Sequence, residues 1–196
     1  MTTLLHEAGA IGTIYHRRAV RDYLPDPIPE ATVRTLLEAA VQAPTAMHLE
    51  PWTFVVVQDK SRLARYSERA KALLKEEIHH STHNPVAALA ARLADPDFNI
   101  FYNAGTLILI CGKPMGQFVT ADCWLAAENL MLAACALGLG SCCIGLAIPA
   151  LDTREVREEL GIPAGVSVVA PIIVGIPAEE PPVVPRKPPE ILAWMR

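Results

Sequence analysis

The chain has 196 residues, of which 52% are hydrophobic and 19% charged, and its formal net charge is −4. This composition excludes a disordered chain, and the length suits one domain over residues 1–196. A mildly acidic chain without a basic block is a poor candidate for nucleic-acid binding, which needs many cations to neutralise phosphates. We therefore expect a single folded domain without a nucleic-acid partner.

Hydrophobic periodicity divides the first half of the chain into helices, one strand and connections. The second helix ends before Pro44, because the residue that precedes a proline avoids helical backbone. The strand is assigned from its β-branched and aromatic residues. In chain order we expect a short amphipathic helix at 4–16, an extended proline-rich connection at 25–29, a helix at 30–43, a buried strand at Trp52–Val57, a helix at 61–77 and a surface excursion at 78–99.

The second half of the chain alternates buried strands with helices. Gly138 and Gly140 end the longest helix, as glycine commonly does. Asp152 with Glu155 predicts a capping box at the start of a short helix. In chain order we expect a buried strand at Thr106–Cys111, a helix at 120–137, a glycine-rich turn at 138–145, a short helix ending at Leu160 and a third strand at Val166–Val174.

Residues 129–151 form a run of 23 residues without a charge, which is long enough to span a bilayer. Three glycines and Pro149 interrupt the run, and lipid does not tolerate exposed irregular backbone. We interpret the run as a buried helix followed by a buried turn, and expect no membrane association. The first 16 residues lack a secretory signal and the five cysteines match no zinc spacing, so we expect reduced thiols and a cytoplasmic location.

The C-terminal arm, residues 176–196, contains six prolines that favour an extended backbone over a helix. Ile191, Leu192 and Trp194 follow the prolines. Apolar side chains of this size need a surface to cover, either on this subunit or on another.

Four segments offer groups that bind ligands. Residues 17–21, Arg-Arg-Ala-Val-Arg, can surround an anion because guanidinium groups bind phosphate bidentately, with a solvated basic patch as the alternative. Residues 43–52 form a proline-fixed loop that can hold a flat heteroaromatic ring, or simply connect a helix to a strand. The glycines of 138–145 let backbone approach a ligand, or only end a helix. The fourth segment, Arg186-Lys187, does not by itself predict a binding site, because paired basic residues are common in tails.

Taken in order, these segments resemble the nitroreductase family of FMN-dependent oxidoreductases, and the resemblance spans nearly the whole chain. Residues 17–21 are similar to the family's Arg-Arg-Ser-x-Arg element, and residues 43–52 to its Ala-Pro-Ser-x-x-Asn-x-Gln-Pro-Trp element. The remaining similarities are to the strand that follows, to the central dimer helix with its Gly-x-Gly turn, and to the C-terminal arm, at residues 101–111, 127–140 and 175–188.

The resemblance implies an α+β, three-layer fold with a central sheet flanked by helices, and an intertwined homodimer with shared active sites. It implies FMN as cofactor, NADH or NADPH as electron donor, and a small-molecule acceptor such as a nitroaromatic or a quinone. Hydride would pass through the flavin N5 atom in a ping-pong reaction, so no side chain is assigned as acid or base, and no metal is expected. The cofactor-binding residues it implies are Arg17, Arg18, Ala19, Arg21, Pro44, Thr45, Ala46, Met47, His48, Cys143, Ile144, Gly145 and Arg186.

The resemblance also divides these residues by role. Arg17 and Arg18 would bind the phosphate end, and Arg186 would close over it. Arg21 would lie near flavin N1 and the C2 carbonyl, where a fixed cation favours the reduced state. The Pro44–His48 loop would come from the other subunit and line the ring. Residues 143–145 would present backbone groups to the flavin.

Three positions depart from the family pattern. Ala19 replaces a serine, His48 an asparagine and Glu50 a glutamine. A carboxylate near the ring opposes accumulation of negative charge unless it is protonated or paired. His48 and Glu50 motivate one alternative, a non-enzymatic flavin-binding dimer. A further alternative is a substrate-specific biosynthetic flavin dehydrogenase of the same fold.

Two other patterns in the sequence offer reactive side chains. His79 and His83 have the spacing of one helix face, but no metalloprotease motif surrounds them, and a mobile, exposed excursion is the better interpretation. The family resemblance implies that such an excursion borders the substrate opening. Cys142 or Cys143 with His48 would make a thiol pair, but nothing in the sequence fixes their distance.

Overall fold

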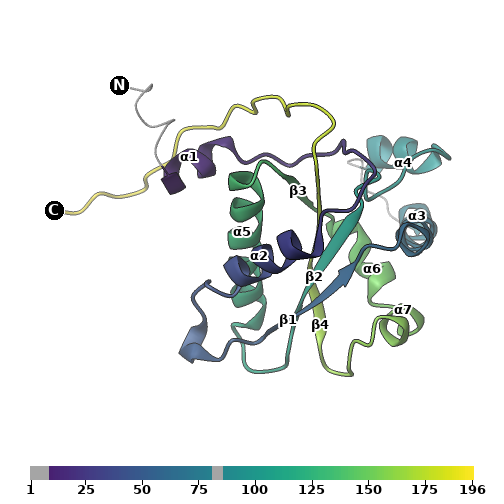
Figure 1. The fold of residues 1–196 in the computed structure, drawn as a ribbon, viewed down its shortest axis with the longest axis horizontal. Helices are drawn as coiled ribbons and strands as arrows, with labels where there is room; N and C mark the ends of the chain where they lie inside the picture. The colour runs from purple at the N-terminus through teal and green to yellow at the C-terminus, as the bar shows by residue number, and fades with distance from the viewer. Residues whose placement is uncertain (1–8, 81–85) are drawn as a thin grey trace.

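The computed structural model describes residues 9–80 and 86–196 as a four-stranded antiparallel sheet with helices on both faces (Figure 1). The sheet order is β1-β2-β4-β3, and every neighbouring pair is antiparallel. The strands are β1 (Trp52–Val57), β2 (Thr106–Gly112), β3 (Gly140–Cys143) and β4 (Ser167–Gly175). The helices are α1 (Gly9–His16), α2 (Glu30–Ala40), α3 (Lys60–His80), α4 (Val86–Ala94), α5 (Val119–Ala136), α6 (Ile148–Leu151) and α7 (Arg154–Glu159), with 3₁₀ turns η2 (Ala46–His48) and η3 (Gly145–Ala147).

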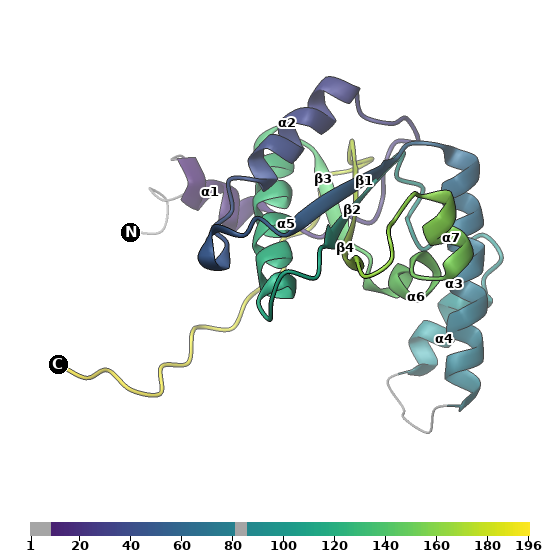
Figure 2. The same cartoon turned by 90° about the horizontal axis from the view of Figure 1, so that it is seen from below.

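The two sheet faces are buried by different sets of helices, which makes three layers. Successive side chains of a strand point to opposite faces. Leu107 and Leu109 of β2 pack in one apolar cluster with residues of α3, α6 and α7. Ile108 and Ile110 pack in the other cluster, with residues of α2 and α5. Figure 2 shows the sheet between α5 and α2 on one side and α3, α6 and α7 on the other. The predicted α+β, three-layer fold is confirmed.

Strand β1 has the predicted bounds, but it is not the buried strand that its composition indicates. Its ends, Trp52 and Val57, are buried, whereas Val56 is 38% exposed. The reason is topological, because β1 lies at the edge of the sheet and pairs only with β2 among the described residues. By contrast, all seven residues of β2 are buried, as predicted.

The predicted glycine-rich turn at 138–145 is wrong in its middle, where Gly140–Cys143 forms β3 and pairs with β4. Gly138 does end α5, with a positive φ of 74°. Gly140 serves close packing instead, because a Cβ there would lie 2.8 Å from the Val20 side chain. Strand propensity did not reveal β3, since glycine is unfavourable in strands and only tertiary packing selects it here.

The predicted capping box is also wrong. Thr153 precedes α7 and makes no side-chain cap, and its hydroxyl donates to the Ala150 carbonyl at 2.8 Å. The Asp152 carboxylate accepts a hydrogen bond from Arg157 instead. Arg157 also donates to the carbonyls of Pro163 and Val166. The Asp152 carboxylate therefore pairs with the Arg157 guanidinium and does not cap α7. The same guanidinium holds the loop between α7 and β4.

The segment predicted as a surface excursion is mostly helical. Helix α3 continues to His80, and α4 packs back on the core, where Leu93 is fully buried. The Arg92 guanidinium lies 4.6 Å from the centre of the Phe98 ring. Residues 4–8 of the first predicted helix, and His83 of the predicted histidine pair, lie outside the described residues.

The charge-free run 129–151 contains the second half of α5, then β3, η3 and α6. Within the described ranges, no helix is both long and apolar enough to cross a membrane. The interpretation of the run as separate buried elements is confirmed for its helix, since the buried side chains Leu130, Met131 and Ala134 lie on α5.

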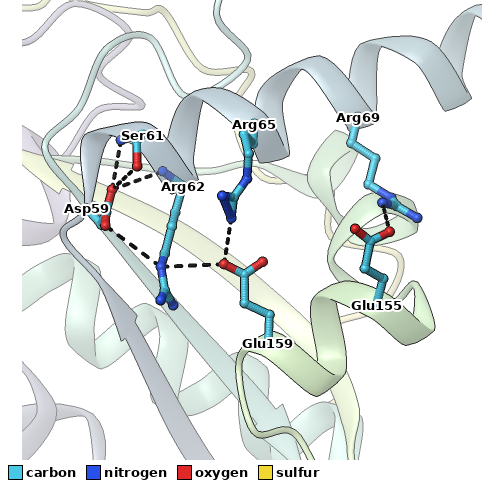
Figure 3. Close-up of polar contacts among 7 residues, drawn as sticks. All are labelled: Asp59, Ser61, Arg62, Arg65, Arg69, Glu155 and Glu159. Carbon is cyan, nitrogen blue, oxygen red and sulfur yellow. Dashed lines mark hydrogen bonds and ion pairs between the residues drawn. The ribbon is translucent and has the colours of Figure 1, made fainter.

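Helices α3 and α7 are joined on their outer side by charged side chains (Figure 3). Arg65 and Arg62 both reach the Glu159 carboxylate, and Arg69 pairs with Glu155. The groups are largely exposed, and such pairs contribute little to stability one by one.

Candidate functional site

The segment at residues 17–24 lies between β3 and the start of the C-terminal arm. The backbone N–H of Val20 donates to Ser141 of β3 at 3.0 Å. Farther along, Leu24 donates to Ile176 at 2.9 Å, and Ala178 of the arm donates to Asp22 at 3.1 Å. These bonds bring the arginine-rich segment and the arm together, although more than 150 residues separate them in the chain.

A cavity of about 570 Å³ lies where the two segments meet. Arg18, Ala19 and Arg21 line it from one segment, and Arg186 lines it from the arm. Within residues 9–80 and 86–196, none of these three guanidinium groups forms an ion pair with a carboxylate. Arg18 donates to the carbonyls of Tyr15 and Arg17. Four of the predicted site residues are therefore brought to one cavity.

The same cavity also has acidic walls, which the sequence did not indicate. Asp22 lines it beside Arg21, and Glu179 and Glu180 line it from the arm. Three carboxylates thus balance the formal charge of the three guanidinium groups. Binding of an anion there depends on the directed N–H donors of arginine more than on a net positive potential.

Arg17 occupies a different position from its neighbours. Its Nε lies 3.5 Å from the Glu128 carboxylate of α5. Together with Arg18, Arg17 lines an adjoining cavity of about 520 Å³, whose wall also contains Cys135 and Ser141. Arg17 is thus near the predicted site but already carries a counter-ion.

The cysteines of β3 are not activated nucleophiles. Burial raises the pKa of Cys142, against the opposing charges of Arg21 and Arg17. Burial also raises the pKa of Cys143, to about 11. Both thiols therefore stay protonated at neutral pH, which removes the basis for the thiol-pair interpretation. Across the described ranges, no group of three or more His, Cys, Asp or Glu residues is arranged to hold a metal ion.

Residues after β3 begin the η3 turn. The Ile144 N–H donates to the Pro171 carbonyl of β4 at 2.8 Å, and the Ile144 side chain is buried. Gly145 is exposed, with no atom within 4 Å of where its Cβ would be. The open backbone at Gly145 is compatible with its predicted role, whereas the Ile144 N–H is already used in the sheet.

The loop at residues 44–50 lies at the opposite end of α5 from the arginines. Its Ala46 N–H donates to the Asp122 carboxylate in the first turn of α5, while Cys135, in the last turn, lines the cavity with Arg17. Asp122 and Cys135 are separated by about 20 Å along the helix axis. A single chain therefore does not bring Pro44–His48 to the arginine cavity. Figure 1 shows the loop that follows α2 at the other end of α5 from α1.

This loop is conformationally unusual. Met47, His48 and Glu50 all have positive φ, of 55°, 54° and 46°, and none is a glycine. Left-handed backbone costs such residues free energy, and it is concentrated at ligand sites. The Met47 side chain is 84% exposed, so the loop presents an apolar group to its surroundings.

A model of the nitroreductase family matches residues 14–176, which is most of the chain. This chain belongs to the nitroreductase family. The resemblance inferred from its motifs is confirmed, and the protein is an oxidoreductase. The matched residues include the arginine-rich segment, the 44–50 loop and β3 but stop before Arg186.

Individual nitroreductase relatives agree with this assignment. An NADH dehydrogenase from Thermus thermophilus is 31% identical, with 84% of each chain covered. A 5,6-dimethylbenzimidazole synthase from Rhodospirillum rubrum is 32% identical, over 85% of this chain and 81% of the relative. The crystal structure of a nitroreductase with bound FMN from Bacteroides fragilis superposes with a TM-score of 0.78 at 29% identity, covering 96% of this chain and 98% of that chain.

Asp122 and Glu128 were not predicted from the sequence as residues that contact the site. They are the two charged residues of a mostly apolar helix, and both contact predicted site segments. A charge inside an apolar helix is costly unless it has a partner, so that pattern was the available signal. The acidic residues Glu179 and Glu180 gave no comparable signal.

Proposed function

We propose that this protein is an FMN-dependent oxidoreductase that passes hydride from NADH or NADPH to a nitroaromatic, quinone or similar small acceptor in a ping-pong reaction. The observation that carries the proposal is the convergence of Arg18, Arg21 and Arg186 on one cavity. The family assignment supplies the reaction class. A relative of known structure contains FMN, which supports the choice of cofactor.

The donor set suits the phosphate of FMN. The phosphate brings close to two negative charges, and guanidinium groups bind such oxyanions with paired hydrogen bonds. Arg18 and Arg186 approach the cavity from opposite ends of the chain, so they would hold the phosphate from two sides. Ala19 contributes no hydroxyl, so this chain relies on its arginines for the side-chain contacts that the family's serine makes.

The flavin ring requires a second surface. When bound, FMN supplies the two-electron chemistry, and the protein supplies binding, orientation and electrostatics. The Pro44–His48 loop is a rigid candidate for ring contact, yet it lies about 20 Å along α5 from the arginine cavity of its own chain. A homodimer in which a second copy contributes this loop would complete the site.

Exposed apolar groups support the homodimer. Trp124 and Leu125 of α5 are 42% and 45% exposed, and Leu192 and Trp194 of the arm are 93% and 72% exposed. Large apolar side chains concentrated on two segments mark an interaction surface. The cytoplasmic location expected from the sequence belongs to this proposal, and the five free cysteines are compatible with a reducing compartment.

A second candidate is a biosynthetic flavin enzyme with one specific substrate. The observation that favours it is the 32% identity to the Rhodospirillum rubrum 5,6-dimethylbenzimidazole synthase over most of both chains. His48 and Glu50, which depart from the family pattern, lie in the loop proposed to face the ring and would set such specificity. Family membership argues against the non-enzymatic flavin-binding alternative.

A spectrum and a rapid-mixing experiment test these proposals. The purified protein should be yellow, or should become yellow when FMN is added. NADH or NADPH should bleach the colour, and a quinone or nitroaromatic should restore it. A protein that stays colourless with FMN contradicts the whole proposal. Bleaching without reoxidation by any general acceptor, but with turnover of one narrow substrate class, selects the biosynthetic candidate.

A further inference from the structure

The carboxylate of Asp122 has an unusual environment. It lies in the first turn of α5 and is only 4% exposed. Aspartate is almost never buried to this degree without a compensating partner. The N-terminus of a long helix favours a negative charge, and the backbone N–H of Ala46 donates to Asp122 Oδ1 at 3.1 Å. The carboxylate therefore lies between the start of α5 and the 44–50 loop.

The loop that Asp122 contacts is held in a strained conformation. Met47 and His48 are consecutive residues in the left-handed region, and Glu50 follows in the same region. Left-handed backbone costs each of these residues free energy relative to right-handed backbone. A strained segment of this kind keeps its shape only where neighbouring structure fixes it.

The internal hydrogen bonds of the loop do not tie it to the rest of the fold. His48 N–H donates to the Thr45 carbonyl, Leu49 N–H to Ala46, and Glu50 N–H to the Thr45 hydroxyl. Among the described residues, the bond from Ala46 to Asp122 is the one hydrogen bond that joins residues 45–50 to another element. The residue that fixes this loop is thus on the helix, not in the loop.

We propose that Asp122 is a positioning residue of this enzyme, which sets the loop that faces the flavin ring. This inference rests on the proposed function. Asp122 touches neither cofactor nor acceptor, and it acts through the Ala46 N–H on the orientation of Met47 and His48. Loss of the anchor lets the left-handed residues relax, which withdraws the loop from the ring and lowers affinity for FMN.

The test compares Asp122→Ala with Asp122→Asn. The asparagine amide oxygen can accept the same N–H, so Asp122→Asn should bind FMN within about threefold of the wild type, whereas Asp122→Ala should lose about tenfold or more, as for one hydrogen bond to a charged group. The visible circular dichroism of the bound flavin should change in the alanine variant and return in the asparagine variant. A purely structural role would not move that band.

A matched control is Ser67→Ala. The Ser67 hydroxyl is also buried, and its oxygen accepts one backbone N–H, that of Ile100 at 3.0 Å, on the other face of the sheet. Ser67→Ala should reduce the melting temperature without changing the visible circular dichroism of the bound flavin. A second variant, Ala46→Pro, removes the same bond from the donor side and leaves the Asp122 carboxylate in place. Thr45 already has the extended backbone that precedes proline.

The outcomes separate the two levels of the proposal. Ala46→Pro should weaken FMN binding as Asp122→Ala does. The double variant should bind FMN about as well as the single variants, because both substitutions remove the same hydrogen bond. Wild-type protein that does not bind FMN overturns the proposed function and this inference together. Wild-type protein that binds FMN, with unchanged affinity and an unchanged flavin band in Ala46→Pro or Asp122→Ala, overturns only the role of Asp122.

Discussion

The Tyr23 hydroxyl donates to the Val20 carbonyl at 2.7 Å, inside the segment that carries the predicted phosphate-binding arginines. Tyr23 is 5% exposed, and burial raises its pKa well above the usual range, so it remains a donor. Its ring also packs closely on Gly175, where a Cβ would lie 2.9 Å from it. This tyrosine thereby shapes the bend between Arg21 and the arm.

Tyr23→Phe should lower the free energy of unfolding by about 1–2 kcal/mol, because the Val20 carbonyl loses its buried donor. Tyr66→Phe is the matched comparison. The Tyr66 hydroxyl lies near the Glu159 carboxylate without hydrogen-bond geometry, and it has no partner among the described residues. Removal of the Tyr66 hydroxyl should leave the free energy of unfolding unchanged or raise it. Urea unfolding checks both, and an equal loss in the two variants would contradict this difference in their hydroxyl contacts.

Arg18→Ala, Arg21→Ala and Arg186→Ala should each weaken FMN binding by about tenfold or more, since positions 18 and 186 supply charged donors to the proposed phosphate site and Arg21 supplies the cation proposed beside the flavin ring. Flavin fluorescence titration measures this. Riboflavin, which lacks the phosphate, should bind the wild type and the variants at positions 18 and 186 with similar affinity. Arg34→Ala is the control, because Arg34 is exposed and pairs only with Glu30 of the same helix in the described structure. Equal losses for FMN and riboflavin would place positions 18 and 186 away from the phosphate.

Asp59 makes stability depend on pH at the start of α3. Its Oδ1 accepts hydrogen bonds from the Ser61 hydroxyl and from the N–H groups of Ser61 and Arg62 (Figure 3). The Ser61 hydroxyl bond is the main cause that lowers the pKa of Asp59 below its ordinary value of 3.8, and the Arg62 N–H adds to it. A lowered pKa in the folded state means that this contribution is present above pH 3.8 and is lost as the pH falls below it.

Asp59→Ala should therefore reduce the melting temperature at pH 7 and reduce it less near pH 3, where the wild-type carboxyl is also protonated. Glu38→Ala is the control, because Glu38 is an exposed carboxylate of another helix, α2, and is not among the partners of Asp59 in the described structure. Scanning calorimetry at the two pH values measures the difference. A deficit that grows as the pH falls would show that the sign of the argument is wrong.

Replacing Leu192 and Trp194 of the arm with alanine should weaken self-association, because these are among the most exposed apolar side chains of the chain. Sedimentation velocity across a dilution series should show dimers for the wild type and a shift toward monomers for the double variant. Val183→Ala, on the proximal arm, should shift the equilibrium less, since it removes less apolar area. A wild type that is monomeric at all concentrations would contradict the shared site.

Much of the fold was predictable because buried strands and helices have recognisable patterns of apolar residues in the sequence. The continuous apolar runs at Thr106–Cys111 and Val166–Val174 match β2 and β4 to within one residue at each end. Gly138 ends α5 through its own backbone preference. Strand β3 has no such local pattern, since its Gly140 is required by close packing against the Val20 side chain. A contact with a residue 120 positions away cannot be inferred from periodicity.

The candidate site was predictable to a similar limit. Its arginines were found because guanidinium chemistry and motif order are visible in the residues. Their meeting with Arg186 depends on the backbone bonds of Leu24 and Ala178, which no local pattern encodes. The Asp122 anchor was missed because a carboxylate in an apolar helix looks like an exception until its partner, Ala46, is seen. The sequence thus identified the arginine side chains of the candidate site, whereas their position relative to Arg186 could be seen only in the folded structure.

The distance in the chain between the two sides of the arginine cavity has a consequence for biosynthesis. Arg21 is translated 165 residues before Arg186, and the sheet that holds them together needs β4, which is made only shortly before the arm. A nascent chain released or stalled ahead of the arm would have the first two guanidinium groups and lack the third. Chains fold as segments emerge, so this pocket is completed only after the arm has been made. Binding of an anionic ligand that needs all three guanidinium groups would therefore follow synthesis of the arm, and products truncated before the arm would be selectively deficient in it.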